Sequence, residues 1–250
     1  MSDTGAAGRP DAGSADATGA GSADTSGPRS SNRAVRVLAP ADGRAAAACL
    51  ARGFDQEPAK LAMLPRPEQR QVVLEMAAAN QLHAALRYGT AHAAVVDGEL
   101  ASVAVWSPPG VSPITASGAV RAGLALLTNL PAVAGAVPQV VSVLVRDLPG
   151  GVALVRQRRR AVDQASRGLT WHLLLFATVP EHRGQGLGRL LLDRQLHRCD
   201  EDGAAVWLET TDPVNPPIYE RFGFSTVAHT AGPAWLPGLW VMRREPGAAG

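Results

Sequence analysis

Two patterns of apolar residues distinguish the expected strands of this chain from its expected helices. Short apolar runs bounded by Gly, Pro or Asp are typical of strands. Such runs cover 35–38, 92–96, 100–106, 170–179, 204–209, 226–229 and 239–243. Alanine- and leucine-rich stretches, some with apolar side chains four and seven residues apart, predict helices instead. They cover 40–52, 68–87, 116–130, 138–164 and 186–201, with a break at Pro149-Gly150-Gly151 and a short helix after Pro216.

The order of these elements predicts a mixed α/β sheet of about six to seven strands flanked by helices. A doubly wound parallel sheet would instead need strands and helices in strict alternation. Two of the strands are separated by Asp97-Gly98, a pair that readily adopts the positive φ angles of a tight hairpin turn.

The first 33 residues are almost all Gly, Ala, Ser, Thr and Asp, with scattered Pro and Arg. They cannot bury enough apolar surface to offset the entropy of ordering, so we expect a disordered tail over 1–33. One folded domain is expected over 34–246. Within it, residues 110–168 form an apolar helical insertion that packs over the sheet or against another subunit.

Composition excludes several classes of protein. The chain has 250 residues, of which 46% are hydrophobic and 18% charged, so it can bury a full core. A net charge of +2 gives no general reason to bind nucleic acid or an anionic membrane. The sequence shows neither a long uninterrupted apolar run nor a secretory signal, and the two cysteines lie far apart in expected helices. We therefore expect a cytoplasmic protein without a metal site.

Three glycines, Gly184, Gly186 and Gly188, follow one expected strand and precede an expected helix. The first N–H groups of a helix have no internal partner, and the helix dipole favours negative charge there. Glycines carry no Cβ atom, so phosphate oxygens can approach these N–H groups closely. The segment therefore indicates a pyrophosphate-binding loop, with a glycine-rich turn that binds nothing as the alternative.

Two other phosphate-binding motifs fit this segment less well. A P-loop requires Lys and then Ser or Thr after its last glycine, whereas Gly188 is followed by Arg189-Leu190. A dinucleotide fingerprint requires G-x-G-x-x-G directly after the strand. Here the third glycine is missing and Pro180-Glu181-His182-Arg183 intervenes, although Glu209 lies where a ribose-binding acid would be.

Two motifs together carry a family resemblance. The run Arg183-Gly184-Gln185-Gly186-Leu187-Gly188 resembles the R/Q-x-x-G-x-G/A signature of the GCN5-related N-acetyltransferases (GNAT). Further along, residues 208–224, LETTDPVNPPIYERFGF, resemble a later motif of that superfamily. The resemblance is strongest to antibiotic acetyltransferases of the puromycin N-acetyltransferase group, which share Trp171 and a C-terminal Trp240 followed by M-x-R. It extends more weakly to 35–39 and 104–108, and only loosely to 110–168.

The resemblance implies a GNAT fold that binds acetyl-CoA as a co-substrate where two neighbouring strands splay apart. In that superfamily the loop amides hold the pyrophosphate, and strand backbone holds the pantetheine arm. The matching positions are Phe176, Thr178, Arg183, Gly184, Gln185, Gly186, Leu187, Gly188, Arg189 and Asn215. Phe176 and Thr178 would act through their backbone. Asn215 either contacts the coenzyme or caps the helix that begins at Pro216.

Acetyl transfer to an amine needs a proton donor for the departing thiolate and an acceptor for the amine proton. Tyr219, one of two tyrosines, matches the motif tyrosine that protonates the sulfur; otherwise it is packed with its hydroxyl bonded elsewhere. Glu209 at a strand end is the candidate base, or else a structural carboxylate that ties down the next turn. His172 is a weaker candidate, since such a side chain is more often packed or at the surface, and His182 is expected at a solvent-facing turn.

The sequence thus predicts an acetyl-CoA-dependent N-acetyltransferase that acts by direct transfer to the primary amine of a small molecule. A puromycin-like antibiotic is the leading acceptor, and residues 110–168 are expected to line its pocket. The alternatives are acetylation of a protein or metabolite amine, a non-catalytic acyl-CoA-binding sensor, and a partner-binding scaffold. A monomer or homodimer is expected, without nucleic-acid or membrane partners.

Overall fold

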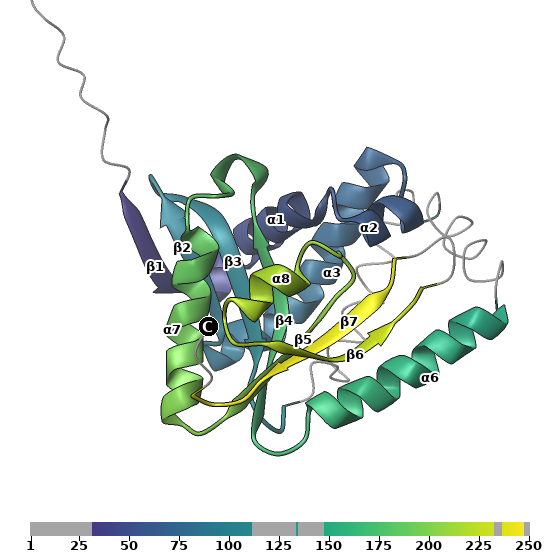
Figure 1. The fold of residues 1–250 in the computed structure, drawn as a ribbon. Coiled ribbons are helices and arrows are strands. Elements are labelled where there is room, and N and C mark those ends of the chain that lie inside the picture. The colour runs from purple at the N-terminus through teal and green to yellow at the C-terminus, as the bar shows by residue number, and fades with distance from the viewer. Residues whose placement is uncertain (1–31, 112–133, 135–147, 233–236, 248–250) are drawn as a thin grey trace, which may run out of the picture. The chain divides into compact units, whose positions relative to one another are not determined.

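The computed structural model describes residues 32–111, 134, 148–232 and 237–247, which include a seven-stranded sheet (Figure 1). The chain divides into two units, Met1–Ser31 and Asn32–Gly250, and all described residues belong to the second. The predicted tail up to residue 31, the helix at 116–130 and the first part of the helix at 138–164 lie outside the described residues.

The sheet is mixed, as predicted. Its strands are β1 (Arg33–Val37), β2 (Ala91–Val96), β3 (Glu99–Ser107), β4 (Thr170–Thr178), β5 (Ala205–Thr210), β6 (Ser225–Thr230) and β7 (Leu239–Arg244). Their order is β1-β2-β3-β4-β5-β7-β6. Every neighbouring pair is antiparallel except β4 and β5, which are parallel. The predicted hairpin is confirmed, because Asp97 and Gly98 between β2 and β3 have φ angles of 51° and 91°.

Most helices match the sequence pattern. The described helices are α1 (Gly43–Phe54), α2 (Pro58–Met63), α3 (Pro67–Tyr88), α6 (Leu148–Ala165), α7 (Leu187–Glu201) and α8 (Pro216–Glu220). A 3-10 turn over Pro40–Asp42 precedes α1, and another over Pro180–His182 precedes the glycine loop. The six-residue helix α2 was not predicted, because it is too short to show a helical period.

Two predicted boundaries are wrong. The expected break at Pro149-Gly150-Gly151 is absent, since all three residues lie within the first turn of α6. Proline is tolerated in a first helical turn because its missing N–H would have no intrahelical partner there. The predicted tail also extends too far, because Arg33 is already part of β1 and pairs with Val96 of β2.

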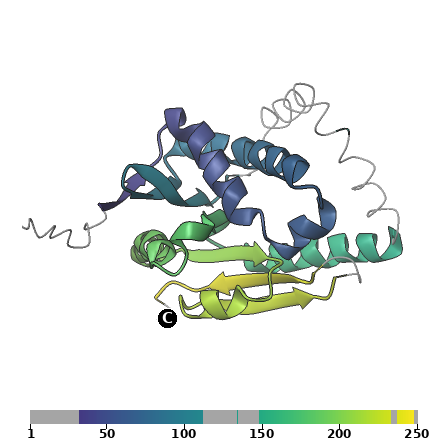
Figure 2. The same cartoon turned by 90° about the horizontal axis from the view of Figure 1, so that it is seen from above.

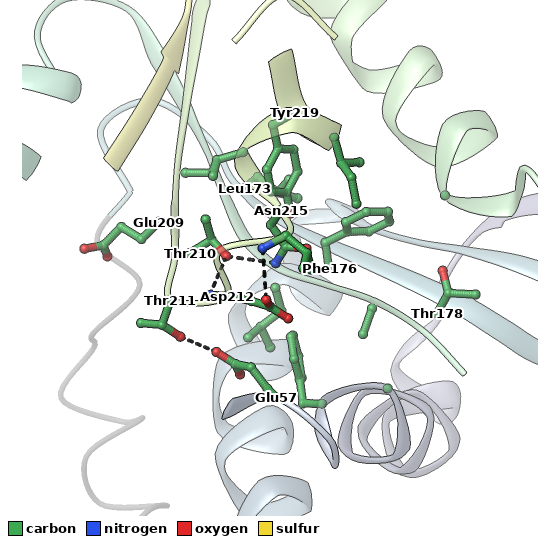
Figure 3. Close-up of a pocket in the computed structure, with 18 of the residues that line it drawn as sticks. Glu57, Leu173, Phe176, Thr178, Glu209, Thr210, Thr211, Asp212, Asn215 and Tyr219 are labelled. Carbon is green, nitrogen blue, oxygen red and sulfur yellow. Dashed lines mark hydrogen bonds between the residues drawn. The ribbon is translucent and has the colours of Figure 1, made fainter. Parts of the chain in front are cut away.

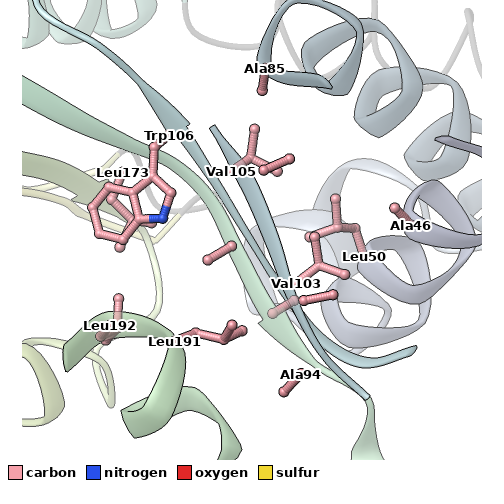
Figure 4. Packing of buried hydrophobic residues seen from close by; sticks show 14 of the residues in the cluster. Ala46, Leu50, Ala85, Ala94, Val103, Val105, Trp106, Leu173, Leu191 and Leu192 are labelled. Atoms are coloured by element: carbon pink, nitrogen blue, oxygen red, sulfur yellow. The ribbon is translucent and has the colours of Figure 1, made fainter. Parts of the chain in front are cut away.

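The core lies on both faces of the sheet because side chains alternate along each strand. Val103 and Val105 of β3 point toward α1 and α3, whereas Trp106 points toward α7 (Figure 4). As the helical spacing predicted, Leu192, Leu196 and Cys199 of α7 are all buried. At the other end of the sheet, α6 runs alongside β6 and β7 (Figure 2) and buries Ala161 and Ala165 against Trp207 and Val241.

Strands β4 and β5 separate halfway along β4. They pair only over Thr170–Leu173 and Ala205–Leu208, and beyond this point β4 pairs with β3 alone. The register of β3 against β4 shifts at the same place, because Val105 pairs with Leu175 while Trp106 pairs with Leu173. A bulge at Leu174 bends a strand and increases its twist. The expected splay is thus confirmed, and it leaves the backbone of residues 174–178 without a strand on the β5 side.

Candidate active site

A cavity of about 710 Å³ lies where β4 and β5 separate (Figure 3). Most of its wall comes from four parts of the chain: the glycine loop with the start of α7, the free half of β4, the end of β5 with α8, and the segment from α1 to α3. Arg158 of α6 and Leu239 of β7 complete it. Ten of the sequence-predicted site residues line it: Phe176, Thr178, Arg183, Gly184, Gly186, Leu187, Gly188, Glu209, Asn215 and Tyr219. Gln185 and Arg189 lie outside it.

The glycine loop presents unpaired main-chain donors. Gly184 and Gly186 have φ angles of 73° and 78°, which L side chains rarely adopt, and Gly186 is the N-cap of α7. The first amide of α7 with a main-chain partner is that of Leu190, which donates to the Gly186 carbonyl at 3.1 Å. Within the described part of the chain, the amides from Gly184 to Arg189 have no such partner. The loop therefore has the open donors that a diphosphate site requires.

The third glycine leaves room for the Phe176 ring. A Cβ atom at Gly188 would lie 2.7 Å from Cζ of Phe176, which is closer than such atoms approach. The Phe176 ring on β4 therefore packs against the first turn of α7. This contact joins the glycine loop to the strand that would hold the pantetheine arm.

The three polar side chains of the loop contact the protein itself. Arg183 donates from Nε to the Thr178 carbonyl at 3.2 Å and from Nη2 to the Gly53 carbonyl at 2.8 Å. Gln185 donates to the Glu181 carbonyl at 3.1 Å, and exposed Arg189 pairs with Asp193 at 3.3 Å. Coenzyme contacts by Gln185 and Arg189 would therefore come from their backbone amides and not from a side chain in the cavity.

Thr178 ends β4 with a polar side chain. Its hydroxyl lies 2.8 Å from the Ser102 hydroxyl on β3, so the polar group is satisfied within the sheet. A backbone contact from Phe176 or Thr178 to a ligand is compatible with this arrangement, and it stays a prediction.

Tyr219 on α8 is 8% exposed and lies edge-to-face with Phe224, with ring centroids 5.8 Å apart. Burial, followed by repulsion from the Glu57 carboxylate, raises the pKa of the phenol well above its ordinary value. No hydrogen-bond acceptor for its hydroxyl is found among the described residues. The phenol is therefore protonated at neutral pH and can donate its proton to a ligand.

Asn215 occupies the N-cap position of α8 without capping it. Its side-chain amide donates instead to the Thr210 hydroxyl at 2.8 Å, while its main-chain carbonyl accepts from the amides of Ile218 and Tyr219. The side chain thus ties the end of β5 to the start of α8 and positions Tyr219 over the cavity. Its contact with a coenzyme stays a prediction.

The carboxylate of Glu209 is held by α6. Arg158 donates to its Oε2 at 2.6 Å, and its Oε1 is buried without a partner among the described residues. Figure 3 shows this carboxylate pointing away from Tyr219. The geometry favours a structural carboxylate, although it holds the helix α6 and not the next turn. A role for Glu209 as base stays a prediction.

The cavity wall also contains Asp212 and Glu57, and the sequence did not predict Glu57 as a site residue. Glu57 occupies the N-cap position of α2, pairs with Lys60 at 3.3 Å and accepts a hydrogen bond from the Thr211 hydroxyl (Figure 3). It is also close enough to Tyr219 to raise the pKa of that phenol. The signal in the sequence was Glu57-Pro58, an acid before a proline that can begin a helix.

The histidine candidates differ in position. His172 stacks on Trp207 with ring centroids 3.6 Å apart and is not part of the cavity wall. Burial, with a smaller effect of Arg158, lowers the pKa of His172 to about 3. It is therefore a packed side chain, as the sequence favoured. His182 lies in the turn before the glycine loop and lines the cavity.

Comparison with known proteins agrees with this geometry. Residues 140–226 match the family model of the acetyltransferase (GNAT) domain, a range that includes the glycine loop, β4, β5 and α8. An uncharacterised N-acetyltransferase of Schizosaccharomyces pombe is 32% identical over 80 residues, which are 31% of this chain and 32% of that protein. The chain therefore matches only about a third of the length of this curated relative.

Two solved structures are similar over most of both chains. Arylalkylamine N-acetyltransferase 2 of Aedes aegypti aligns with a TM-score of 0.56 and 14% identity, covering 86% of this chain and 100% of its own. The polyamine N-acetyltransferase of Drosophila melanogaster aligns with a TM-score of 0.54, 14% identity and the same coverage. The domain has the GNAT acetyltransferase fold.

The GNAT match covers the parts of the cavity that the sequence pointed to and leaves α1 to α3 outside. Glu57, the N-cap residue of α2, belongs to the part that the family model does not reach. Closeness to the puromycin group is not shown by these comparisons and stays a prediction. None of the described helices is both long and apolar enough to cross a membrane.

Proposed function

We propose that this GNAT domain transfers the acetyl group of acetyl-CoA directly to the primary amine of a small molecule. One observation carries the proposal: the open amides of the glycine loop and the buried, protonated Tyr219 line the same cavity, at the point where β4 leaves β5. A nucleotide diphosphate fits the first feature, and a departing thiolate fits the second.

The reaction breaks the thioester C–S bond and forms a C–N bond, so the nitrogen loses a proton and the sulfur gains one. In our proposal the amides from Gly184 to Arg189 bind the diphosphate, and the free backbone edge of β4 holds the pantetheine arm. Tyr219 donates its proton to the sulfur.

Glu57 is our candidate for the group that receives the amine proton, either directly or through a water molecule. Glu57 and Glu209 both line the cavity and each forms an ion pair, Glu57 with Lys60 and Glu209 with Arg158. Glu57 is preferred because it is close enough to Tyr219 to influence the pKa of that phenol, whereas the Glu209 carboxylate points away from Tyr219.

A small acceptor is supported by the size of the site. A cavity of about 710 Å³ is within the usual range for small-molecule sites, and here the coenzyme arm must share it. The names of the two insect enzymes suggest polyamines and arylalkylamines as amines to test, and the sequence resemblance suggests puromycin.

The first test measures thiol release from acetyl-CoA and the mass gain of four amines: puromycin, spermidine, agmatine and tyramine. We expect at least one amine to gain one acetyl group, with one thiol released per amine modified. Coenzyme binding without turnover on any of the four would favour the sensor or a larger amine acceptor. A wild-type protein without a coenzyme-induced thermal shift would contradict the proposed site itself.

The two carboxylates are compared in the same assay. We expect Glu57→Gln to lower kcat about 100-fold at neutral pH, since general base catalysis contributes at least that much. Glu209→Gln, which leaves an amide in place beside Arg158, is expected to lower kcat less than about tenfold. The opposite order would transfer the role of base to Glu209.

A further inference from the structure

Arg183 of the glycine loop reaches the segment that carries Glu57. Its guanidinium donates to two main-chain carbonyls at once, that of Thr178 at the end of β4 and that of Gly53 in the last turn of α1. Because the two donors are fixed in one planar group, these bonds hold the loop, the strand and the helix in one arrangement. From Gly53, four further residues lead to Glu57.

Two further contacts reinforce this connection. Gly53 lies so close to β4 that a Cβ atom there would be 2.5 Å from the Cβ of Ala177, so the end of α1 is seated directly on the strand. Arg52, the neighbour of Gly53, forms an ion pair with Glu181 in the turn that precedes the glycine loop. The end of α1 is therefore joined to the glycine loop by the Arg183 hydrogen bond and to the preceding turn by the Arg52–Glu181 ion pair, and it packs closely on β4 through Gly53.

The segment after Gly53 is itself tied to the rest of the cavity wall. Asp55 accepts from Nε of buried Arg70 on α3 at 2.8 Å, and Glu57 accepts from Thr211 after β5. A shift of the glycine loop would thus be transmitted through Arg183 to a short, well-anchored segment and not to a free loop.

We propose that Arg183 is a positioning residue that couples the diphosphate loop to Glu57, so that binding of the coenzyme sets the position of the acceptor-side carboxylate. This inference rests on the proposed function. It assigns to Arg183 a task different from neutralising phosphate charge, since both of its bonds go to the protein's own carbonyl groups.

The test separates the charge of Arg183 from its two-carbonyl bridge. Arg183→Lys keeps the positive charge but cannot reproduce the planar pair of donors. Arg189→Gln is the matched control: it removes a positive charge from the same turn, where the side chain contacts Asp193 alone among the described residues. Both side chains are exposed, so both variants are expected to fold, which their melting temperatures check.

The readout is amide hydrogen exchange of residues 54–61 with and without coenzyme A, together with the dissociation constant of coenzyme A. In the wild type we expect coenzyme A to slow exchange in this segment. In Arg183→Lys we expect binding within about threefold of the wild type and loss of that slowing, whereas Arg189→Gln retains it. Kinetics with whichever of the four amines reacts should show a rise of about tenfold in the acceptor KM of Arg183→Lys, with the acetyl-CoA KM nearly unchanged.

Three results would overturn the inference: slowing that persists in Arg183→Lys, slowing that is lost equally in Arg189→Gln, or an Arg183→Lys variant that no longer binds coenzyme A. In the last case the side chain would serve the coenzyme directly. A wild-type protein that fails to bind coenzyme A would instead overturn the proposed function.

Discussion

The hydroxyl of Tyr219 lies in a nearly closed environment beside Glu57, and both the burial and the neighbouring negative charge oppose its ionisation. A phenol in water is already protonated at neutral pH, but the Tyr219 phenol stays protonated over a wider range of pH. Tyr219 therefore stays protonated as the pH rises toward 10, and its own ionisation should cause no loss of activity in that range. With no partner for this hydroxyl among the described residues, it can turn toward a ligand atom.

Replacement of Tyr219 by Phe removes only this hydroxyl and keeps the edge-to-face contact with Phe224. We expect kcat to fall by about 100-fold or more, because the thiolate must leave without its proton donor, while coenzyme affinity stays within about threefold. Steady-state kinetics and calorimetric binding of coenzyme A measure the two quantities. An unchanged kcat would remove Tyr219 from the mechanism.

At the scale of elements, the junction between β4 and α7 depends on Gly188. The Phe176 ring occupies the space beside this glycine, so a methyl group there must displace either the ring or the first turn of the helix. This displacement would disturb the first turn of α7, which presents several of the open amides. Sequence alone showed that a glycine stands here, and the packing gives the reason.

We therefore expect Gly188→Ala to weaken coenzyme A binding about tenfold with little change in the far-UV spectrum. The double variant Gly188→Ala/Phe176→Leu provides the control, since a smaller side chain at residue 176 makes room for the added methyl group. Calorimetric titration with coenzyme A measures both. If the single variant binds as tightly as the wild type, the contact between α7 and β4 does not shape the loop.

For the folded unit as a whole, buried His92 and partly buried His172 dictate how stability depends on pH. Burial, with help from neighbouring arginines, lowers the pKa of His92 to about 4 and that of His172 to about 3. In the unfolded chain both groups take up a proton near pH 6.5. Below that pH the unfolded state binds protons that the folded state does not, so the free energy of unfolding falls.

Between pH 7.5 and pH 5 we expect the free energy of unfolding to decrease by up to about 2 kcal/mol per histidine. The paired carboxylates, such as Asp42 with a pKa of about 2, contribute mainly below this window. Denaturant unfolding at several pH values measures the slope. His172→Phe keeps an aromatic ring on Trp207 and should remove about half of the dependence, and a flat profile in the wild type would contradict the burial of both imidazoles.

Much of this architecture could be predicted from local sequence. Strands β1 to β7 follow from short apolar runs bounded by turn residues, and helices α1, α3 and α7 from alanine- and leucine-rich runs with buried apolar positions. The short helix α2 has no period to detect. Continuity of α6 through Pro149 depends on where that helix begins, which its residues do not specify.

The candidate site also contains features that local sequence predicts and features that depend on tertiary contacts. The glycine loop and Tyr219 lie in two motifs whose residues are close in sequence, so their local geometry is encoded locally. Glu57 shares their cavity because the path of the chain brings α2 to the end of β5, where Thr211, 154 residues away, donates to it. The contacts of Glu209 likewise depend on α6, which places Arg158 on that carboxylate.

Sequence by itself determined the kinds of element, the backbone freedom of the loop and the chemistry available at Tyr219, because these depend on the periodicity and conformational limits of neighbouring residues. The tertiary structure alone decided which carboxylate lies beside the phenol and which arginine joins the loop to α1. Those choices depend on distances between residues far apart in the chain, and such distances arise only when the helices pack on the sheet.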